Sequence, residues 1–417
     1  MRVLLVGSGG REHALAWRLS RSPSPPELHA APGNPGIAQL AVCHPVHAED
    51  GEGVLTLARS LGVDLVVVGP EAPLVAGLGD LLRHGGVPVF GPGAAAARIE
   101  GSKAFAKEVM AAAGVPTPRV LEEPRAPCVV KADGLAAGKG VVVCRTEEEL
   151  RAGLETVRSF GDEIVAEELV EGVEVSVFAL CAGREALALP AVQDFKRAYD
   201  GDQGPNTGGM GSFAPVPGVG DEDVEKVLDA VHRPVLAELA RRGMPFVGAL
   251  FAGLMLTPEG PQVLEFNCRL GDPEAQSLLP LVEGDFVGAL AAAASGELAD
   301  VTLRAADGAA VTVVLAAGGY PAESDRGTPI AGVDAAEASG ALVFHAGTAL
   351  YDGRLVTNGG RVLAVTATGA TIPEARTAAY AAADRISWAG ARRREDIALQ
   401  AASGAELSLV WPEAGGQ

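Results

Sequence analysis

The chain has 417 residues, which is enough for two or three domains with separate cores. It carries 33 Lys and Arg against 53 Asp and Glu, a formal net charge of -20, and so acidic a surface argues against a nucleic-acid partner. Five scattered cysteines without a C-x-x-C pair, and no apolar stretch as long as a membrane span, favour a soluble protein of the reducing cytoplasm.

The first hundred residues alternate between short apolar strands and amphipathic helical stretches. Strands are expected at 3–6, 64–68 and 87–90, and helices near 11–19, 53–61 and 74–83. Such alternation is typical of an open parallel α/β sheet.

A glycine-rich loop, "GSGGREHA" at 7–14, follows the first strand. Glu12 stands where the dinucleotide fingerprint G-x-G-x-x-G requires its third glycine, which argues against a nicotinamide cofactor. A glycine loop that opens a helix still presents free N–H groups to an anion, and Arg11 adds a positive charge. The loop is therefore a candidate anion site.

A second unit begins near residue 102 with "VVKADGLAAGKGVVV" at 129–143 as its most unusual segment. It is not a P-loop, because Gly134 and Gly138 are separated by three residues and Gly140 replaces the hydroxyl residue. β-branched residues on both flanks predict a strand–loop–strand hairpin. With Lys131 before the loop and Lys103 at a predicted helix start, this flap is a plausible clamp for phosphates, although either lysine alone is more often a surface residue.

The rest of this unit is expected to hold a strand over 163–180, a polar glycine-rich segment, a helix near 221–242, and a hairpin that pairs 246–256 with 262–270. The acidic run at 167–174 looks like a strand edge that turns out of its sheet. Its backbone could bind an adenine edge and Glu174 could accept ribose hydroxyls; an ordinary acidic turn is the alternative.

The second strand of that hairpin carries polar residues on one face. Strand alternation predicts Val263, Glu265, Asn267 and Arg269 on one side, and an apolar face on the other. Carboxylate and amide oxygens without His or Cys suit Mg²⁺ or Mn²⁺ better than zinc. A solvated edge strand is the alternative, but a protein that holds a triphosphate needs a metal to bridge the phosphates.

From about residue 306 the pattern changes to strands, a hairpin at 349–355 and a closing helix near 373–386, which predicts an α+β unit.

Taken together, nine segments resemble the phosphoribosylamine–glycine ligases, or glycinamide ribonucleotide synthetases, of the ATP-grasp superfamily. They are "GSGGREHALAW", "APGNPG", "VGPEAPLV", "EGSKAF", "KADGLAAGKGV", "GPNTGGMG", "EFNCRLGDPE", "HAGT" and "TNGGRVL". The resemblance implies an N-terminal α/β domain at 1–101, an ATP-grasp domain at 102–305 with a lid near 115–180, and a C-terminal α+β domain at 306–417. It implies ATP-dependent joining of glycine to 5-phospho-β-D-ribosylamine through a glycyl phosphate, an early step of purine synthesis.

The resemblance also implies a role for each matching residue. The residues implied to bind ATP are Lys103, Lys131, Asp133, Gly134, Gly138, Lys139, Gly140, Glu167, Glu168, Leu169, Val170 and Glu174. Those implied to face phosphoribosylamine or glycine are Gly9, Gly10, Arg11, Asn34, Glu71, Asp194, Lys196, Arg197, Asn206, Thr207, Gly208 and Gly209. Glu265 and Asn267 would hold Mg²⁺ or Mn²⁺, and Arg269 and Asp272 would stand near the acyl phosphate. These two residues and the phosphate-binding Lys131 form the implied catalytic set.

Other interpretations stay open. Another ATP-grasp carboxylate–amine ligase or a carboxylase is one, and a non-catalytic nucleotide sensor is the second. Carboxylases of the superfamily supply a further metal-binding acid from the strand before the metal strand, but 246–256 contains no acid. The connection at 119–126 is shorter than in the family, which has an additional helix there, so the outline of the lid is not fixed by the resemblance. Small molecules are the expected partners, and no obligate protein partner is evident.

Overall fold

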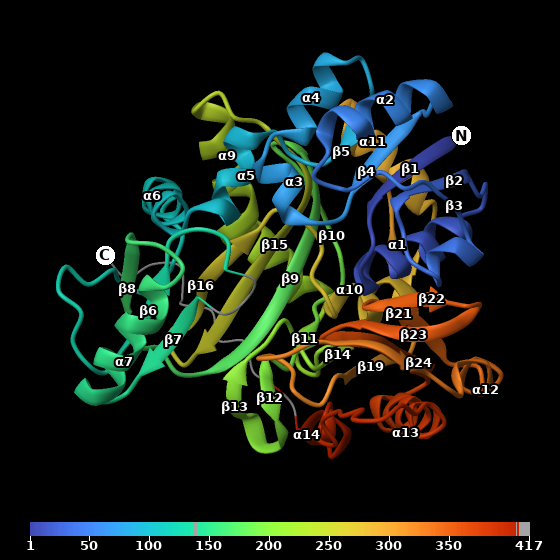
Figure 1. Ribbon diagram of the computed structural model, residues 1–417. Coiled ribbons are helices and arrows are strands. Elements are labelled where there is room, and N and C mark those ends of the chain that lie inside the picture. The colour runs from blue at the N-terminus through green and yellow to red at the C-terminus, as the bar shows by residue number, and fades with distance from the viewer. Residues whose placement is uncertain (137–139, 406, 408–417) are drawn as a thin grey trace.

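The computed structural model describes residues 1–136, 140–405 and 407. Figure 1 shows the chain passing from an N-terminal sheet through a central sheet with a lid beside it to a C-terminal sheet. Within the described residues, no helix is both long enough and apolar enough to cross a membrane. The domain limits implied by the resemblance stay predictions.

The N-terminal unit is the parallel sheet that the alternation predicted. Its strands run in the order β3-β2-β1-β4-β5, and every pairing is parallel. The strands are β1 (Arg2–Gly7), β2 (Glu27–Pro32), β3 (Val42–Cys43), β4 (Leu65–Val68) and β5 (Val89–Phe90). The connecting helices are α1 (Gly10–Ser20), α2 (Gly51–Leu61), α3 (Glu71–Val75), α4 (Leu78–His84) and α5 (Ala94–Gly101).

One helix of this unit was predicted wrongly. The single helix expected over 74–83 is two helices, α3 and α4, separated at Gly77. Gly77 has a φ of 98°, in the left-handed region that a continuous α-helix cannot contain, and it precedes the first residue of α4.

The lid is a small antiparallel sheet with its own apolar core. Its order is β7-β6-β8, built from β6 (Cys128–Ala132), β7 (Val141–Cys144) and β8 (Ile164–Glu168), with α7 (Glu147–Arg158) packed on it. Lys131 pairs with Val141, so the predicted hairpin is confirmed. Figure 1 places this lid on the opposite side of the central sheet from the N-terminal unit. In the shortened connection, Val120 forms a bridge to Glu167 of β8.

The central sheet is antiparallel, with the order β10-β9-β15-β16. Its strands are β9 (Val173–Gly183), β10 (Glu185–Ala188), β15 (Phe246–Thr257) and β16 (Gly260–Asn267). The single strand expected over 163–180 is therefore two strands, β8 in the lid and β9 in the central sheet. The predicted turn out of the sheet lies between them, at 169–172. The predicted β15–β16 hairpin is confirmed, although β16 ends at Asn267.

A β-bulge in β16 overturns part of the predicted alternation. Gly253 pairs with Glu265, but the next residue, Leu254, pairs with Val263, so Leu264 is the extra residue. Val263 is consequently buried in the same apolar cluster as Phe266, and not on the face of Glu265.

The helix predicted near 221–242 is confirmed as a continuous run with one π-helical turn. It consists of α8 (Asp221–Val227), the π-turn η3 (Leu228–His232) and α9 (Arg233–Arg241).

The remaining helices of the central region are α6 (Lys103–Ala113), α10 (Glu274–Leu278) and α11 (Phe286–Ser295). Short elements are η1 (Ile37–Gln39), η2 (Asp200–Asp202), η4 (Leu279–Leu281), β12 (Arg197–Tyr199), β13 (Gln203–Asn206), β17 (Val282–Glu283) and β18 (Arg304–Ala305).

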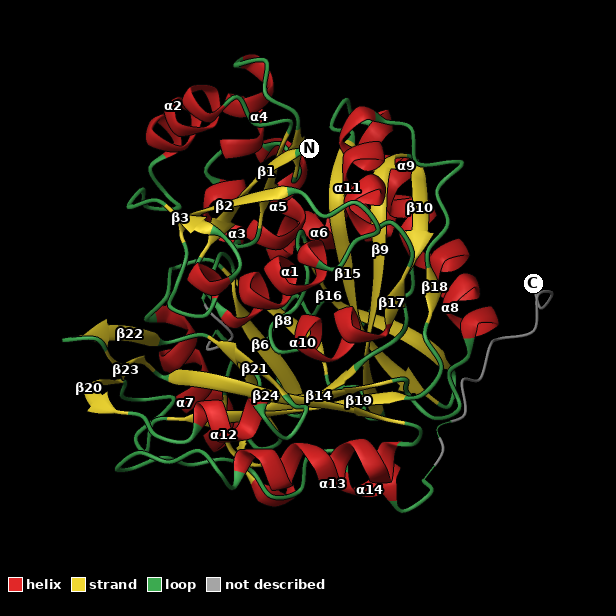
Figure 2. Ribbon diagram, turned by 90° about the vertical axis from the view of Figure 1, so that its right-hand side faces the viewer, coloured by secondary structure: helices red, strands yellow, loops and turns green. Residues whose placement is uncertain are grey.

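The C-terminal sheet has the order β11-β14-β19-β24-β21, and α13 covers one of its faces (Figure 2). Its strands are β11 (Gln193–Asp194), β14 (Gly211–Ala214), β19 (Ala309–Ala316), β21 (Leu342–His345) and β24 (Arg361–Gly369). A second sheet joins β20 (Asp325–Pro329), β23 (Arg354–Gly359) and β22 (Thr348–Tyr351); the helices are α12 (Val333–Glu337), α13 (Ile372–Ala383) and α14 (Leu399–Ala402). The hairpin at 349–355 and the closing helix are confirmed. β11 and β14 come before residue 305 in the sequence but belong to the C-terminal sheet, where β14 pairs with β19. The segment between them therefore lies against the C-terminal unit.

Candidate active site

Loops from three neighbouring parallel strands open the site. Gly7 of β1 is level with Pro32 of β2, and Val6 is level with Val68 of β4, so the loops that follow these strands emerge at one edge. β2 and β4 lie on opposite sides of β1, so the strand order reverses direction at β1. Open α/β sheets bind ligands at the carboxyl ends of the strands at such a reversal. The predicted substrate residues Gly9, Asn34 and Glu71 all lie on these loops.

The predicted anion loop at the start of α1 is already occupied by carboxylates of the protein. Gly9 N donates to Glu12 Oε2 at 2.6 Å, and Arg11 N donates to Asp272 Oδ2 at 3.2 Å. A Cβ on Gly10 would lie 2.6 Å from Gln276 Nε2, so the loop packs closely on α10. Glu12, which breaks the dinucleotide fingerprint, is thus a structural cap. Any phosphate bound here would have to displace Asp272.

The Asn34 side chain is engaged at both of its polar atoms. Its Nδ2 donates to Ser8 O and His345 O, each at 2.8 Å, and its Oδ1 accepts from Gly36 N and Ile37 N, each at 2.9 Å. Asn34 therefore shapes the loop after β2 and ties it to the C-terminal unit.

Arg269 lies between two acids, Glu71 and Glu100, beside the loops that follow the N-terminal strands. Its Nη2 lies 2.9 Å from Glu100 Oε1 and its Nε 3.3 Å from Glu71 Oε2, while Arg11 Nη1 lies 3.8 Å from the same Glu71 oxygen. Burial acts to raise the pKa of Glu71, but Arg269 and Arg11 overcome it and hold the pKa at about 2. For Glu100, burial prevails and raises the pKa. Glu100 was not predicted, although it begins the quoted segment "EGSKAF".

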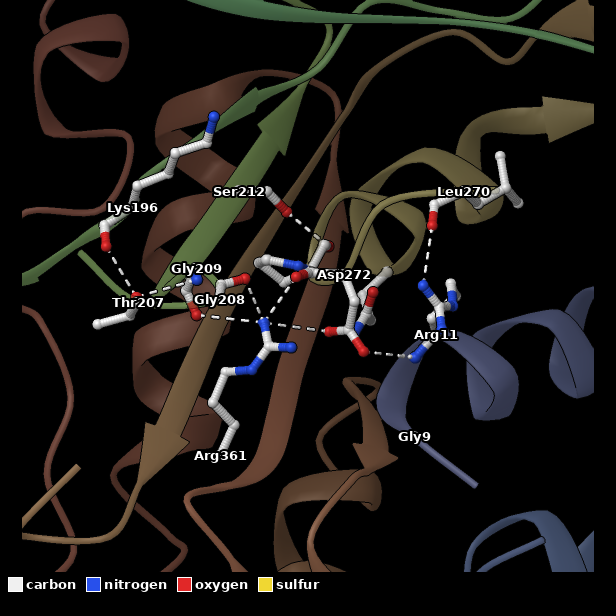
Figure 3. Close-up of polar contacts among 12 residues, drawn as sticks. Gly9, Arg11, Lys196, Thr207, Gly208, Gly209, Ser212, Leu270, Asp272 and Arg361 are labelled. Carbon is white, nitrogen blue, oxygen red and sulfur yellow. Dashed lines mark hydrogen bonds and ion pairs between the residues drawn. The ribbon is translucent and has the colours of Figure 1, made fainter. Parts of the chain in front are cut away.

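Asp272 joins the N-terminal loop to the C-terminal sheet (Figure 3). Besides Arg11 N, its carboxylate accepts a 2.8 Å bond from Gln276 Nε2 and lies 3.4 Å from Arg361 Nη1. Burial acts to raise the pKa of Asp272, but the charges of Arg361 and Arg11 lower it, so the carboxylate stays ionised. Arg361 was not predicted as a site residue; its segment "TNGGRVL" was among the resembling motifs.

Lys131 is buried and fixed by two partners. Its Nζ lies 2.8 Å from Glu167 Oε2 and donates to Leu264 O, also at 2.8 Å, at the bulge of β16. An ammonium has three hydrogens, so one remains for a phosphate oxygen. Glu167 also contacts Lys107 Nζ at 3.0 Å, an unpredicted lysine that donates to Thr117 and Pro118 as well. The Glu167 side chain therefore positions lysines.

The flap is anchored to the start of α6. Asp133 accepts from the backbone N of Lys103 and, at 3.0 Å, from Ser102 Oγ, so its carboxylate caps the helix. Lys103 Nζ donates to Gly134 O at 2.8 Å, and burial lowers the pKa of this lysine. Gly140 O accepts from Ala132 N at 2.8 Å on the far side of the flap. The predicted residues Gly138 and Lys139 lie outside the described residues.

The predicted metal residues face a cluster of cations. Glu265 Oε1 lies 3.9 Å from Lys196 Nζ, and Lys196 also forms an ion pair with Glu174. Burial acts to raise the pKa of Glu265, but Lys196, Lys131 and Lys103 lower it, so the carboxylate is ionised. Asn267 is buried and its Nδ2 has no hydrogen-bond partner among the described residues.

This donor set fits a hard divalent cation. A half-turn of the Asn267 amide would present its oxygen beside the Glu265 carboxylate. Among the described residues, no cluster of three or more His, Cys, Asp or Glu could hold a metal ion alone. An ion here would therefore depend on the Glu265–Asn267 pair and on oxygens of a bound phosphate.

The segment predicted to bind adenine connects the lid to the central sheet. Leu169 and Val170 follow β8, at the start of the connection to β9. The backbone N of Glu168 already donates to Arg119 O at 3.0 Å, and its carboxylate contacts Arg119 at the surface. An adenine would therefore have to use the polar backbone atoms of Leu169 and Val170.

The half-buried Asp194 and the buried Glu274 are two acids whose pKa values depend on the charge of Lys196. Burial raises the pKa of Asp194 well above its usual range, with Lys196 opposing and Glu274 adding to the effect. Burial also raises the pKa of Glu274, whose Oε1 is 3.4 Å from Ser176 Oγ. Burial acts to lower the pKa of Lys196 itself, but Glu174 and Asp194 raise it, so this ammonium stays charged.

The predicted segment 206–209 lies between the lid and the C-terminal sheet. Asn206 Nδ2 donates to Val141 O of the lid at 3.4 Å, and Gly208 N donates to the Tyr320 hydroxyl at 3.0 Å. Arg197, by contrast, donates to Gly204 O within its own hairpin, at 2.8 Å. The structure thus gathers most of the predicted residues around Lys196, Glu265 and Asp272, and leaves Arg197 in a local contact.

Two buried histidines join the first and last units and should make stability depend on pH. His345 N donates to His13 Nδ1 at 2.8 Å. Burial lowers the pKa of His13 to about 3 and that of His345 to about 4. In the unfolded chain both protonate near pH 6.5, so the unfolded state binds more protons below that pH. The contribution of these two histidines to the free energy of unfolding is therefore fully present above pH 6.5. It is lost as the pH falls toward 4, by up to about 1.4 kcal/mol per pH unit for each histidine.

We expect His345→Gln to flatten this dependence in urea unfolding measured at pH 7, 6 and 5. His47→Gln, at an exposed position, serves as the control and should keep the wild-type slope. Equal slopes for wild type and His345→Gln would contradict the assignment.

Three family models match the chain in succession. They are described as the N domain, the ATP-grasp (A) domain and the C domain of phosphoribosylglycinamide synthetase, and they match residues 1–100, 101–275 and 310–400. Together they account for most of the chain.

Curated proteins and solved structures agree with these matches. A phosphoribosylamine–glycine ligase of Streptomyces coelicolor is 51% identical over 96% of this chain and 100% of its own length. One from Rhizobium meliloti is 48% identical over 96% and 99%. A crystal structure of the ligase from Thermotoga maritima has a TM-score of 0.82 at 36% identity, covering 95% of this chain and all of that one. The biotin carboxylase subunit of a pyruvate carboxylase, at 18% identity and a TM-score of 0.61, shares the fold.

Proposed function

The chain belongs to the phosphoribosylglycinamide synthetase family, and from this premise we propose that it ligates glycine to 5-phospho-β-D-ribosylamine at the expense of ATP. The products are glycinamide ribonucleotide, ADP and phosphate, in purine biosynthesis. The observation that carries the proposal is the position of Glu265: its Oε1 lies 3.9 Å from Lys196 Nζ, and Lys131 donates to the carbonyl oxygen of the adjacent Leu264.

The geometry suits activation of a carboxylate. A glycine carboxylate is a poor electrophile, and transfer of the γ-phosphoryl group to one of its oxygens provides a leaving group. The C–N bond then forms as the ribosylamine nitrogen attacks the acyl carbon and phosphate departs. Lys131 and Lys103 would neutralise the phosphates and hold them in line with the carboxylate, and the lid would exclude water. Arg269 and Asp272 would lie toward the acyl phosphate.

A divalent cation, Mg²⁺ or Mn²⁺, would be held by Glu265 and Asn267. When bound, it would neutralise charge on the phosphates of ATP. The nucleotide base would lie against Leu169 and Val170. Glu174 would accept from the ribose hydroxyls in addition to its ion pair with Lys196.

The remaining predicted residues would form the side of the site that receives the two other substrates. The half-buried Asp194 and the buried Glu274 have raised pKa values, and the positive charge of a bound glycine ammonium group would favour their ionised forms, which could then hold it. The loops after β1, β2 and β4 would receive the ribosylamine. Cytoplasmic localisation is supported by five cysteines that are all free thiols.

The experiment is an ADP-release assay in which glycine and freshly prepared phosphoribosylamine are omitted in turn. We expect release to require both substrates, and bicarbonate to fail as a substitute for glycine. Bicarbonate-dependent release would favour a carboxylase, for which β15 supplies no acidic metal ligand.

An isotope experiment tests the order of the chemistry. With glycine labelled by ¹⁸O in its carboxylate, we expect one labelled oxygen to appear in the released phosphate and the other to stay in the amide. The label follows because the oxygen that attacks phosphorus leaves with it. Unlabelled phosphate, measured by mass spectrometry after complete turnover, would rule out a glycyl phosphate.

A further inference from the structure

Arg361, the first residue of β24, reaches out of the C-terminal sheet into two loops of the site (Figure 3). Its Nη1 lies 2.5 Å from Gly208 O and 2.6 Å from Asp272 O. Gly209 O and Asp272 Oδ1 are also near it, each at 3.4 Å. A guanidinium Nη carries two hydrogens, so the two short contacts are its hydrogen bonds and the longer ones are mainly electrostatic. One side chain thus holds the turn at 208–209 against the turn at 272–273.

The C-terminal unit holds the Gly208 residue at both of its backbone polar groups. Arg361 donates to its carbonyl oxygen, and the Tyr320 hydroxyl accepts from its N–H at 3.0 Å. The turn is also packed tightly. Gly209 has a φ of 109°, and a Cβ there would lie 2.3 Å from Pro273 Cδ. The 208–209 turn therefore has little freedom while Arg361 is in place.

The turn is bonded directly to the lysine of the cation cluster. Thr207 Oγ1 accepts from Gly209 N at 2.9 Å and donates to Lys196 O at 2.8 Å. Thr207 N donates to the same carbonyl oxygen at 2.8 Å. Lys196 in turn carries its ammonium to Glu174 and toward Glu265. The backbone of Lys196 is thus fixed by the turn that Arg361 holds.

Through Asp272 the same guanidinium acts on the other wall of the site. The Asp272 carboxylate accepts from Arg11 N at the start of α1 and from Gln276 Nε2. Arg361 therefore links the cation cluster to the loop that follows β1.

We propose that Arg361 is a positioning residue for the ligation: it sets Lys196 and Asp272 at their working separation, so that the carboxylate being activated and the amine that attacks it are aligned. This inference rests on the proposed function. In the part of the chain that the structure describes, Arg361 forms no hydrogen bond or ion pair with Lys103, Lys131 or the lid strands, which would bind the nucleotide. Its loss should therefore impair ligation without weakening nucleotide binding.

The test compares Arg361→Gln with Arg354→Gln, which alters an exposed arginine on the neighbouring strand β23. We expect Arg361→Gln to lower kcat/KM for glycine by roughly 10- to 100-fold, the range for losing hydrogen bonds to a charged group. The dissociation constant of MgATP, measured by calorimetry, should not change. Arg361→Lys keeps the charge but not the planar donor pair, and it should fall between wild type and Arg361→Gln. Arg354→Gln should match wild type.

Each outcome decides the matter. Wild-type kcat/KM in Arg361→Gln would overturn the inference, and so would a loss of MgATP affinity in step with kcat/KM, since that indicates a general structural role. If Arg361→Gln does not fold, Tyr320→Phe removes only the acceptor for Gly208 N and should give a smaller loss of the same kind. Absence of glycine-dependent ADP release in the wild-type protein would instead overturn the proposed function, whatever the variants do.

Discussion

Replacing Glu265 by Gln should lower turnover by more than about 100-fold, because changes in residues that merely support metal ligands already cost 10- to 100-fold. The substitution keeps the size of the side chain and removes the charge. Glu265 is the only carboxylate beside Asn267 on that face of β16, and its ionised form is favoured by Lys196, Lys131 and Lys103. A neutral amide would bind a hard cation more weakly and leave the lysines uncompensated.

The fold should survive this change. Glu265 is only partly buried, and Lys196 retains its ion pair with Glu174. We therefore expect the urea unfolding midpoint of Glu265→Gln to stay close to that of wild type. Mn²⁺ binding in the presence of ADP, followed by electron paramagnetic resonance, should be lost together with turnover. Glu185→Gln removes an exposed carboxylate from the same sheet and should change neither. Normal turnover of Glu265→Gln at low magnesium would show that the metal assignment is wrong.

Much of the fold could be predicted because its signals are local. Alternating apolar strands and helices in the first hundred residues predict the parallel sheet, and β-branched flanks around a glycine loop predict the lid hairpin. The breaks were harder. A helix pattern runs through Gly77, and whether a glycine continues or ends a helix depends on its surroundings. The bulge at Leu264 has no local signal, since it is a matter of register against Gly253 in another strand.

The site was predictable as a set of residues but not as a set of partners. Alternation along one strand is enough to place Glu265 and Asn267 on the same face. What each polar group contacts is decided by folding. Arg11 N donates to the carboxylate of Asp272, 261 positions away in the sequence. That carboxylate occupies the anion site that the sequence predicts at the glycine-rich loop. Lys107, Glu100 and Arg361 were missed for the same reason, because the oppositely charged partner of each one lies in a distant segment: Glu167, Arg269 and Asp272, respectively.

Lys131→Met should both destabilise the protein and stop the reaction, and these two effects can be separated. The substitution leaves Glu167 buried and without its 2.8 Å partner. Removing one member of a buried ion pair typically costs 3–5 kcal/mol of stability. We expect a loss of about 3 kcal/mol here, because Lys107 still lies beside Glu167. Turnover should fall by more than about 100-fold if the third hydrogen of the ammonium serves a phosphate oxygen.

The double variant Lys131→Met with Glu167→Gln removes the unpaired charge as well as the ammonium. The amide introduced by Glu167→Gln would lie beside the ammonium group of Lys107, which keeps its bonds to Thr117 and Pro118. We expect urea unfolding to show that the second change restores most of the lost stability, because an amide costs less to bury than an unpaired carboxylate. Turnover, measured by ADP release at saturating glycine, should stay as low as in the single variant. Recovery of turnover along with stability would mean that Lys131 only neutralises Glu167 and that the phosphates are bound without it.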